Sequence, residues 1–238
     1  MSRDAAGDLL YRLRTRALTL AQRALARPGA IVHRGVALDV ARGVHHPAPF
    51  LGLGFGALQE LALERLPPRA AVLELGTGAG FWALAAARRG FVVTATELPE
   101  VPLAPVAQAA DRMGVHLRLL HSDLFEDLGD ARFDAILFNP PFHDATPRAP
   151  VERAWCGGDV VRRCLREAAA HLTADGAMYL IMPRLDRARY VTELAPWTID
   201  VAASQWFPLV GRAELLALRP GRRVGLVTRA PREAGGSC

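Results

Sequence analysis

The sequence predicts an α/β fold in which a mostly parallel, twisted sheet carries helices on both faces. Two observations lead to this prediction. From residue 69 onward, short apolar stretches of strand length alternate with amphipathic stretches of helix length, and glycine or polar turns separate them. Three of these turns directly follow a strand, which places them at the carboxyl edge of the sheet, where ligands bind in folds of this class.

The N-terminal part of the chain differs in its pattern and predicts an added cap. Leucines and alanines at three-to-four spacing predict an amphipathic helix from Asp8 to Ala26. Pro28 and Gly29 end it, and extended or loop structure is expected from there to Pro49, followed by a helix over 55–66. We therefore divide the chain into a helical cap (1–65), a main domain (66–220) and a flexible tail rich in arginine, glycine and proline (221–238).

The main domain follows from the alternation of strand and helix patterns. Each strand is a run of β-branched and other apolar residues, and each helix has apolar residues spaced to lie on one face. Strands are expected at 71–75, 91–96, 115–120, 133–138 and 177–182, helices at 81–89, 105–113, 159–172 and 185–194, and two further strands close the pattern.

Composition fits a single globular domain with a modest extension. The chain has 238 residues, of which 51% are hydrophobic and 22% are charged. No apolar run reaches the length of a membrane span, and arginines interrupt the region where a signal peptide would be hydrophobic, so we expect a cytoplasmic protein without membrane contact. The three cysteines form no Cys-x-x-Cys pair, which argues against a disulfide framework or a structural zinc, and no metal is expected.

The net charge of +5 does not by itself indicate a nucleic-acid partner. All 29 basic residues are arginine and none is lysine, which we attribute to a coding bias rather than to a binding surface. The arginines are scattered along the chain, as is typical of solvated helix faces. The oligomeric state is not predicted.

A strand that turns through glycines into a helix forms the first candidate site. Glycines let backbone N–H groups approach a ligand at a helix N-terminus. Phe81 stands where a dinucleotide-binding fingerprint has its third glycine, which disfavours NAD. The candidate residues of this turn are Glu74, Gly76, Thr77, Gly78 and Gly80.

Acidic residues end the next two predicted strands. Glu97, with Leu98 after it, is placed to accept hydrogen bonds from both hydroxyls of a ribose. Asp123 can accept from an adenine amino group, with Leu124 beside the ring. Together with the glycine turn, these acids predict a nucleoside site.

The second candidate site is the segment Asn139-Pro140-Pro141-Phe142 after an apolar strand. Two prolines stiffen the turn, and the Pro140 carbonyl and the Asn139 side-chain oxygen are two acceptors that can grip both hydrogens of a planar NH₂ group. Phe142 can lie against the flat face of the same substrate. Positioning of this kind favours an in-line displacement at nitrogen without a dedicated base.

These motifs resemble class I S-adenosylmethionine-dependent methyltransferases of the small-domain, Asn-Pro-Pro-aromatic subgroup. The resemblance covers roughly residues 50–218. It implies a Rossmann-like sheet of about seven strands and S-adenosyl-L-methionine as cofactor. By the resemblance, the glycine turn holds the methionine part of the cofactor, Glu97 the ribose and Asp123 the adenine. Asn139 to Phe142 would orient the acceptor nitrogen, and Asn139 is also expected to contact the cofactor.

The resemblance leaves the methyl acceptor open. The run Asn139 to His143 is similar to ribosomal-RNA guanine-amine methyltransferases, whereas Gly157-Gly158-Asp159 is similar to release-factor glutamine methyltransferases. A compact cap could equally close over a small metabolite. The expected substrate contacts are Phe142, His143 and Trp155, the last as part of a lid or as a packing anchor.

Two other functions are compatible with parts of the pattern. The first is a methyltransferase-shaped module that binds nucleic acid or a protein without catalysis, although such a module usually lacks the acceptor-gripping turn. The second is a nicotinamide-dependent oxidoreductase, which Phe81 and the Asn-Pro-Pro turn disfavour.

Overall fold

A computed structural model describes residues 28–41, 44, 54–141, 156–207 and 210–221, together with Leu13, Ala17 and Leu20. Of the helix predicted over 8–26, only Leu13, Ala17 and Leu20 are described, and all three are helical.

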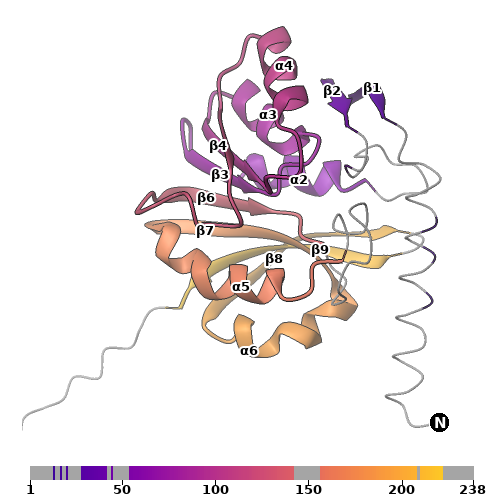
Figure 1. The fold of residues 1–238 in the computed structure, drawn as a ribbon. Coiled ribbons are helices and arrows are strands. Elements are labelled where there is room, and N and C mark those ends of the chain that lie inside the picture. Colours follow the sequence, from indigo (N-terminus) through magenta and orange to yellow (C-terminus); the bar gives the residue numbers. More distant parts are fainter. Residues whose placement is uncertain are drawn as a thin grey trace, which may run out of the picture.

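A seven-stranded sheet forms the centre of the molecule, with strand order β5-β4-β3-β6-β7-β9-β8 (Figure 1). Strand β9 is antiparallel to both of its neighbours, and the other six strands run in one direction. The mostly parallel twisted sheet predicted from the sequence is confirmed. The strands are β3 (Ala71–Leu75), β4 (Val92–Glu97), β5 (Arg118–His121), β6 (Phe133–Phe138), β7 (Leu172–Pro183), β8 (Trp197–Phe207) and β9 (Gly211–Pro220).

Helices cover both faces of this sheet (Figure 1). Successive side chains of each strand point to opposite sides, and both sides of the sheet are apolar, so each side packs against helices. In β6, for example, Leu137 joins the apolar cluster on one face and Ile136 the cluster on the other. The first face carries α2 (Gly56–Leu63), α3 (Phe81–Arg88) and α4 (Ala104–Met113), and the second carries α5 (Val160–Glu167), the 3-10 helices Ala168–His171 and Arg184–Tyr190, and α6 (Val191–Leu194).

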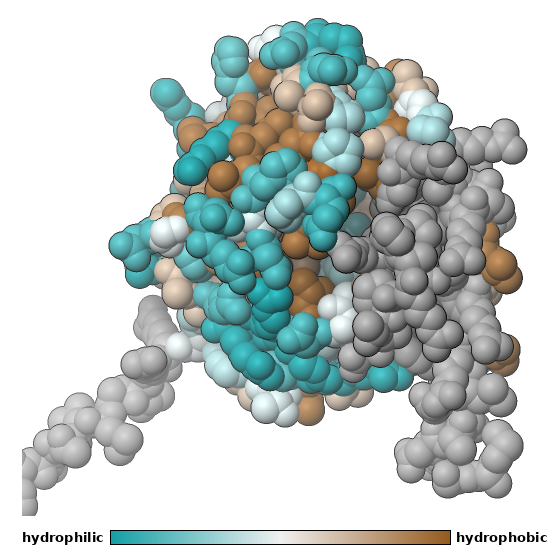
Figure 2. Space-filling model, viewed as in Figure 1, coloured by the Kyte–Doolittle hydropathy of each residue, from teal (hydrophilic) through white to brown (hydrophobic). Residues whose placement is uncertain are grey.

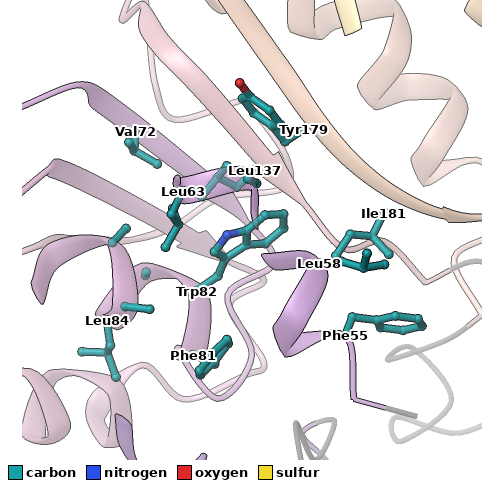
Figure 3. Close-up of a cluster of buried hydrophobic side chains, with 14 of the residues drawn as sticks. Phe55, Leu58, Leu63, Val72, Phe81, Trp82, Leu84, Leu137, Tyr179 and Ile181 are labelled. Carbon is teal, nitrogen blue, oxygen red and sulfur yellow. The ribbon is translucent and has the colours of Figure 1, made fainter. Parts of the chain in front are cut away.

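Trp82 on α3 lies in the middle of the first apolar cluster (Figure 3). Its side chain is fully buried, and its indole N–H donates a hydrogen bond of 2.9 Å to the carbonyl of Gln59 on α2. This pairing satisfies the ring's polar atom while the ring fills the space between α2, α3 and the sheet, with Leu63, Leu137 and Tyr179 around it. The cluster fixes the helix that begins at the glycine turn.

A separate hairpin precedes the sheet. Strands β1 (Gly29–His33) and β2 (Val36–Val40) pair antiparallel through a two-residue turn at Arg34 and Gly35, both with positive φ. The sequence predicted only extended or loop structure here, because an Arg-Gly turn lacks the Asn-Gly or Asp-Gly signal typical of hairpins.

Other element boundaries differ from the predictions by a few residues. Strand β5 starts at Arg118 instead of residue 115, because the left-handed Gly114 ends α4 and residues 115–117 form a connection. The helix predicted over 185–194 is a 3-10 helix followed by the single turn α6. No helix in the described part of the chain is long and apolar enough to cross a membrane.

Candidate functional site

The candidate site lies where the strand order reverses. The chain builds β3, β4 and β5 outward in one direction and then returns to place β6 on the other side of β3. Leu75 at the end of β3 pairs with Phe138 at the end of β6, so the glycine turn and the Asn-Pro-Pro turn start side by side. Ligands bind at such switch points because the two connecting loops diverge to opposite faces and leave a crevice.

The glycine turn takes a conformation that glycine adopts easily. Gly76, Gly78 and Gly80 have φ values of 63°, 55° and 82°. At Gly80 an added Cβ would also lie 2.6 Å from a methyl carbon of Val106 on α4, which is too close for any other residue. Because of these glycines, β3 connects by a short turn to the N-terminus of α3. Within the turn, the Thr77 N–H donates to the carbonyl of Thr96 at 3.0 Å and the Gly80 N–H to the carbonyl of Thr77 at 2.8 Å.

Glu74 is buried beneath this turn. Its Oε2 accepts hydrogen bonds from the Thr77 hydroxyl at 2.6 Å and from the backbone N–H of Ala83 at 2.9 Å. Burial raises the pKa of Glu74 to about 8, although the two hydrogen bonds act in the opposite direction. The side chain therefore links the glycine turn to the first turn of α3. Its carboxyl group is largely protonated, and so uncharged, near pH 7.

Glu97 at the end of β4 also contacts the turn. Its Oε2 accepts from the N–H of Gly78 at 2.8 Å and its Oε1 from the N–H of Leu98 at 2.9 Å. Burial raises the pKa of Glu97, with these backbone hydrogen bonds opposing the effect. A carboxylate has about four lone-pair positions, so both oxygens can accept further hydrogen bonds from a ligand.

Asp123 follows β5, and its position is set by Ser122. The Ser122 N–H donates to the carbonyl of Glu97 at 2.9 Å, and its hydroxyl accepts from the N–H of Asp127 at 3.1 Å. Leu124 has a positive φ of 53° and is buried. Asp123 forms an ion pair of 2.9 Å with Arg163 on α5. This partner was not predicted, because it lies 40 positions away in the chain.

Asn139 is the first residue after β6. Its side-chain Oδ1 is buried and has no hydrogen-bond partner among the described residues. A buried carbonyl oxygen without a partner is unfavourable by about 1–3 kcal/mol, and native proteins rarely leave one unless a ligand or water satisfies it. Pro140 beside it is buried, so the turn presents this acceptor from a fixed backbone.

Gly157 was not among the predicted site residues, yet it lies against the Asn-Pro-Pro turn. A Cβ added there would lie 2.5 Å from Cγ and 2.9 Å from the carbonyl oxygen of Pro141. Only glycine lets the start of α5 come this close. The Gly157-Gly158 pair before a helix was the available signal, but its contact depends on tertiary packing.

The structure thus brings together the turn 76–80, Glu74, Glu97, Leu98, Asp123, Leu124 and Asn139-Pro140-Pro141 along one edge of the sheet. Phe142, His143 and Trp155 lie outside the described residues. His121, which the sequence analysis did not assign to the site, contacts the carbonyl of Leu98 at 3.2 Å through Nδ1. Within the described ranges, no group of three His, Cys, Asp or Glu side chains is arranged to hold a metal ion.

A family model for the methyltransferase small domain matches residues 53–195, which include all of these turns. The chain belongs to this family. The match also covers α2, which we had placed at the end of the cap, and the domain boundary at residue 65 stays a prediction.

Several curated proteins resemble this methyltransferase-family chain in sequence. The ribosomal protein uL3 glutamine methyltransferase of Bradyrhizobium diazoefficiens is 38% identical over 45% of this chain and 39% of its own length. The release factor glutamine methyltransferase of Geobacter sulfurreducens is 33% identical over 49% and 46% of the two chains. The ribosomal RNA small subunit methyltransferase C of Alcanivorax borkumensis is 28% identical over 53% and 36%. The matched part of the chain spans less than half the length of each.

Solved structures of methyltransferases share the fold. A 16S rRNA N2 methyltransferase of T. thermophilus, in complex with AdoMet and guanosine, has a TM-score of 0.57 and 26% identity over 81% of this chain and 50% of that one. A ribosomal protein L11 methylase of Lactobacillus delbrueckii has a TM-score of 0.54 and 22% identity over 68% and 77%, and this likeness concerns the fold alone.

Proposed function

We propose that this protein is an S-adenosylmethionine-dependent N-methyltransferase that acts on a planar amine or amide nitrogen. The observation that supports it most is the buried Oδ1 of Asn139, which has no hydrogen-bond partner in the described part of the chain. It lies beside the glycine turn, at the reversal point of a methyltransferase-family sheet. This oxygen is available to accept a hydrogen bond from a ligand, and a planar NH₂ group is a suitable donor.

The cofactor is proposed to lie along the carboxyl edge. The glycine turn 76–80 holds the methionine part, with Glu74 buried beneath it. Glu97 and Leu98 hold the ribose, and Asp123 and Leu124 the adenine. That the T. thermophilus relative was solved with AdoMet supports this assignment. Bound S-adenosylmethionine would supply a methyl group on a positively charged sulfur.

The chain's own residues act by orientation. The Asn139 oxygen and the Pro140 carbonyl accept one hydrogen each from the acceptor nitrogen, which fixes its plane and turns its lone pair toward the cofactor side of the crevice. Phe142 packs on the acceptor ring or amide. After methylation the nitrogen carries a positive charge and is strongly acidic, so its proton needs no dedicated base.

The acceptor class follows from the relatives only as a proposal. Their names give protein glutamine and ribosomal RNA as substrates, and both present a planar nitrogen. We therefore place the acceptor nitrogen in a glutamine amide or a nucleobase amine, with a small planar metabolite as the alternative that the cap over 1–65 would enclose.

The cofactor assignment is tested by calorimetry with S-adenosylmethionine and the variants Glu97→Ala and Asp123→Ala. Each variant removes a charged hydrogen-bond acceptor, so affinity is expected to fall by about tenfold or more. Asp130→Ala, an exposed carboxylate in the loop before β6, serves as the control and should bind like the wild type. Unchanged affinity in both site variants, or tight binding of NADH by the wild type, would contradict the cofactor assignment.

The acceptor turn is tested by Asn139→Ala. With methyl-labelled S-adenosylmethionine and cell extract, the wild type should transfer label, and the variant should transfer about a hundredfold less while still binding the cofactor, since misplacement of the acceptor by about 1 Å has costs of that order. Label on a macromolecule is retained by a size-cut filter. Treating the retained fraction with nuclease or with protease then shows whether the methyl group is on RNA or on protein. Full turnover by a folded variant contradicts the proposed role.

A further inference from the structure

Arg163 is an unassigned residue that lies directly beside the proposed adenine site. Its Nη1 is 2.9 Å from Oδ2 of Asp123, and its Nη2 is 3.5 Å from Oε1 of Glu126. The short distance to Asp123 and the long one to Glu126 make Asp123 the main partner. The same contact raises the pKa of Arg163.

The packing of α5 holds Arg163 in place. Val161, Cys164 and Leu165 of this helix are buried in the apolar cluster on the second face of the sheet. The opposite side of α5 is hydrophilic in the space-filling view (Figure 2). Arg163 therefore reaches Asp123 from a rigid element, and its side chain is only 29% exposed.

The other two arginines of α5 are directed elsewhere. Arg162 and Arg166 pair with the two carboxylate oxygens of Glu193 on α6, at 3.0 Å and 3.1 Å. Of the three arginines on this helix, only Arg163 is bonded to a residue of the candidate nucleoside site. This division makes Arg166 a matched control for Arg163.

The pairing leaves one oxygen of Asp123 without a hydrogen bond. Oδ2 accepts from the guanidinium of Arg163, whereas Oδ1 has no hydrogen-bond partner among the described residues. An ionised carboxylate only accepts hydrogen bonds. A purine with an amino group at position 6 can donate to this oxygen, and a purine with a carbonyl there places oxygen against oxygen.

We infer that Arg163 is a positioning residue that fixes the Asp123 carboxylate, and that it thereby sets the preference of this site for a 6-amino purine over a 6-oxo purine. The inference rests on the proposed cofactor site. Without Arg163 the carboxylate can rotate about its Cα–Cβ and Cβ–Cγ bonds, and water can take the place of the purine amine.

The test measures two dissociation constants by calorimetry, one for S-adenosylhomocysteine and one for its 6-oxo analogue, S-inosylhomocysteine. The wild type should prefer the 6-amino compound. In Arg163→Gln the ratio of the two affinities is expected to fall by about tenfold, as expected for one misplaced charged hydrogen bond. Arg163→Lys, which keeps the charge, should recover part of the ratio, and Arg166→Gln should leave it unchanged.

The outcomes separate this inference from the function on which it rests. A wild type that binds neither compound overturns the proposed function and the inference together. A wild type that discriminates, with Arg163→Gln equally selective or tighter for S-adenosylhomocysteine, overturns the inference alone. If Arg163→Gln does not fold, Arg163→Lys carries the test. An affinity ratio in Arg163→Lys below that of Arg166→Gln supports the inference, and a ratio equal to that of Arg166→Gln contradicts it.

Discussion

Glu74 illustrates how a single side chain supports the site from below. It is 5% exposed, and it joins Thr77 of the glycine turn to Ala83 of α3 through one oxygen. The sequence placed this acid beside the turn but gave no sign that its partners would come from the protein itself. Its buried position makes its protonation part of the fold's stability.

We predict that Glu74 makes stability depend on pH. Its pKa is about 8 in the folded protein against an ordinary value of 4.5, so the folded state holds an extra proton between those values. Stability from this group is fully present below about pH 4.5 and is lost as the pH rises toward 8, at up to about 1.4 kcal/mol per pH unit. Glu74→Gln, which mimics the protonated acid, should lose less stability over pH 5–8.

Urea unfolding at several pH values provides the measurement. Glu64→Gln, at an exposed carboxylate of the same residue type, is the control and should follow the wild-type curve. Parallel curves for the wild type and Glu74→Gln would show that the carboxyl is ionised in the folded protein throughout this range.

At the scale of elements, the β1–β2 hairpin supports the glycine turn from outside. Ion pairs link Arg34 to Glu60 of α2 and Asp39 to Arg112 of α4. The apolar cluster that follows joins Val40 and Val44 to Ala79 in the turn. The hairpin thus connects two helices of the first face to the loop proposed to hold the cofactor.

Val44→Ala should therefore weaken cofactor binding without removing any polar contact. Val44 is 6% exposed, and its Cγ1 lies 3.5 Å from the position of a Cβ added to Gly78. Loss of about two buried methyl groups is expected to reduce affinity for S-adenosylmethionine several-fold and to speed amide exchange in residues 76–80. Val32→Ala, in strand β1 of the hairpin and at a side chain that is 75% exposed, should change neither. Equal behaviour of the two variants would refute the coupling.

Local sequence signals were sufficient to predict some elements of the fold but not others. Strand β3, the glycine turn and α3 were predicted within a residue or two, because periodicity and glycine spacing are local properties. The hairpin and the contact of Gly157 with Pro141 were not, because an Arg-Gly turn is a weak signal and a close approach between distant segments leaves no periodic pattern. The Asp123–Arg163 pair escaped prediction for the same reason.

At the scale of the whole molecule, the order of the strands brings the functional groups of the site together. The acids after β4 and β5 and the glycine turn after β3 lie on one side of the reversal, and Asn139 after β6 lies on the other. The proposed cofactor and acceptor positions are therefore built by different connections that meet between β3 and β6. The sequence located each part, and the pairing of Leu75 with Phe138 shows that the two turns start from neighbouring strand ends.

The most direct measurement is to locate the transferred methyl group by mass spectrometry after reaction with trideuteromethyl S-adenosylmethionine. We expect the wild type to place the label on an amide or exocyclic amine nitrogen of the acceptor, and Asn139→Ala to transfer almost none. Label on carbon, oxygen or sulfur, or equal labelling by the folded variant, would contradict the claim that Asn139 grips a planar nitrogen for methylation.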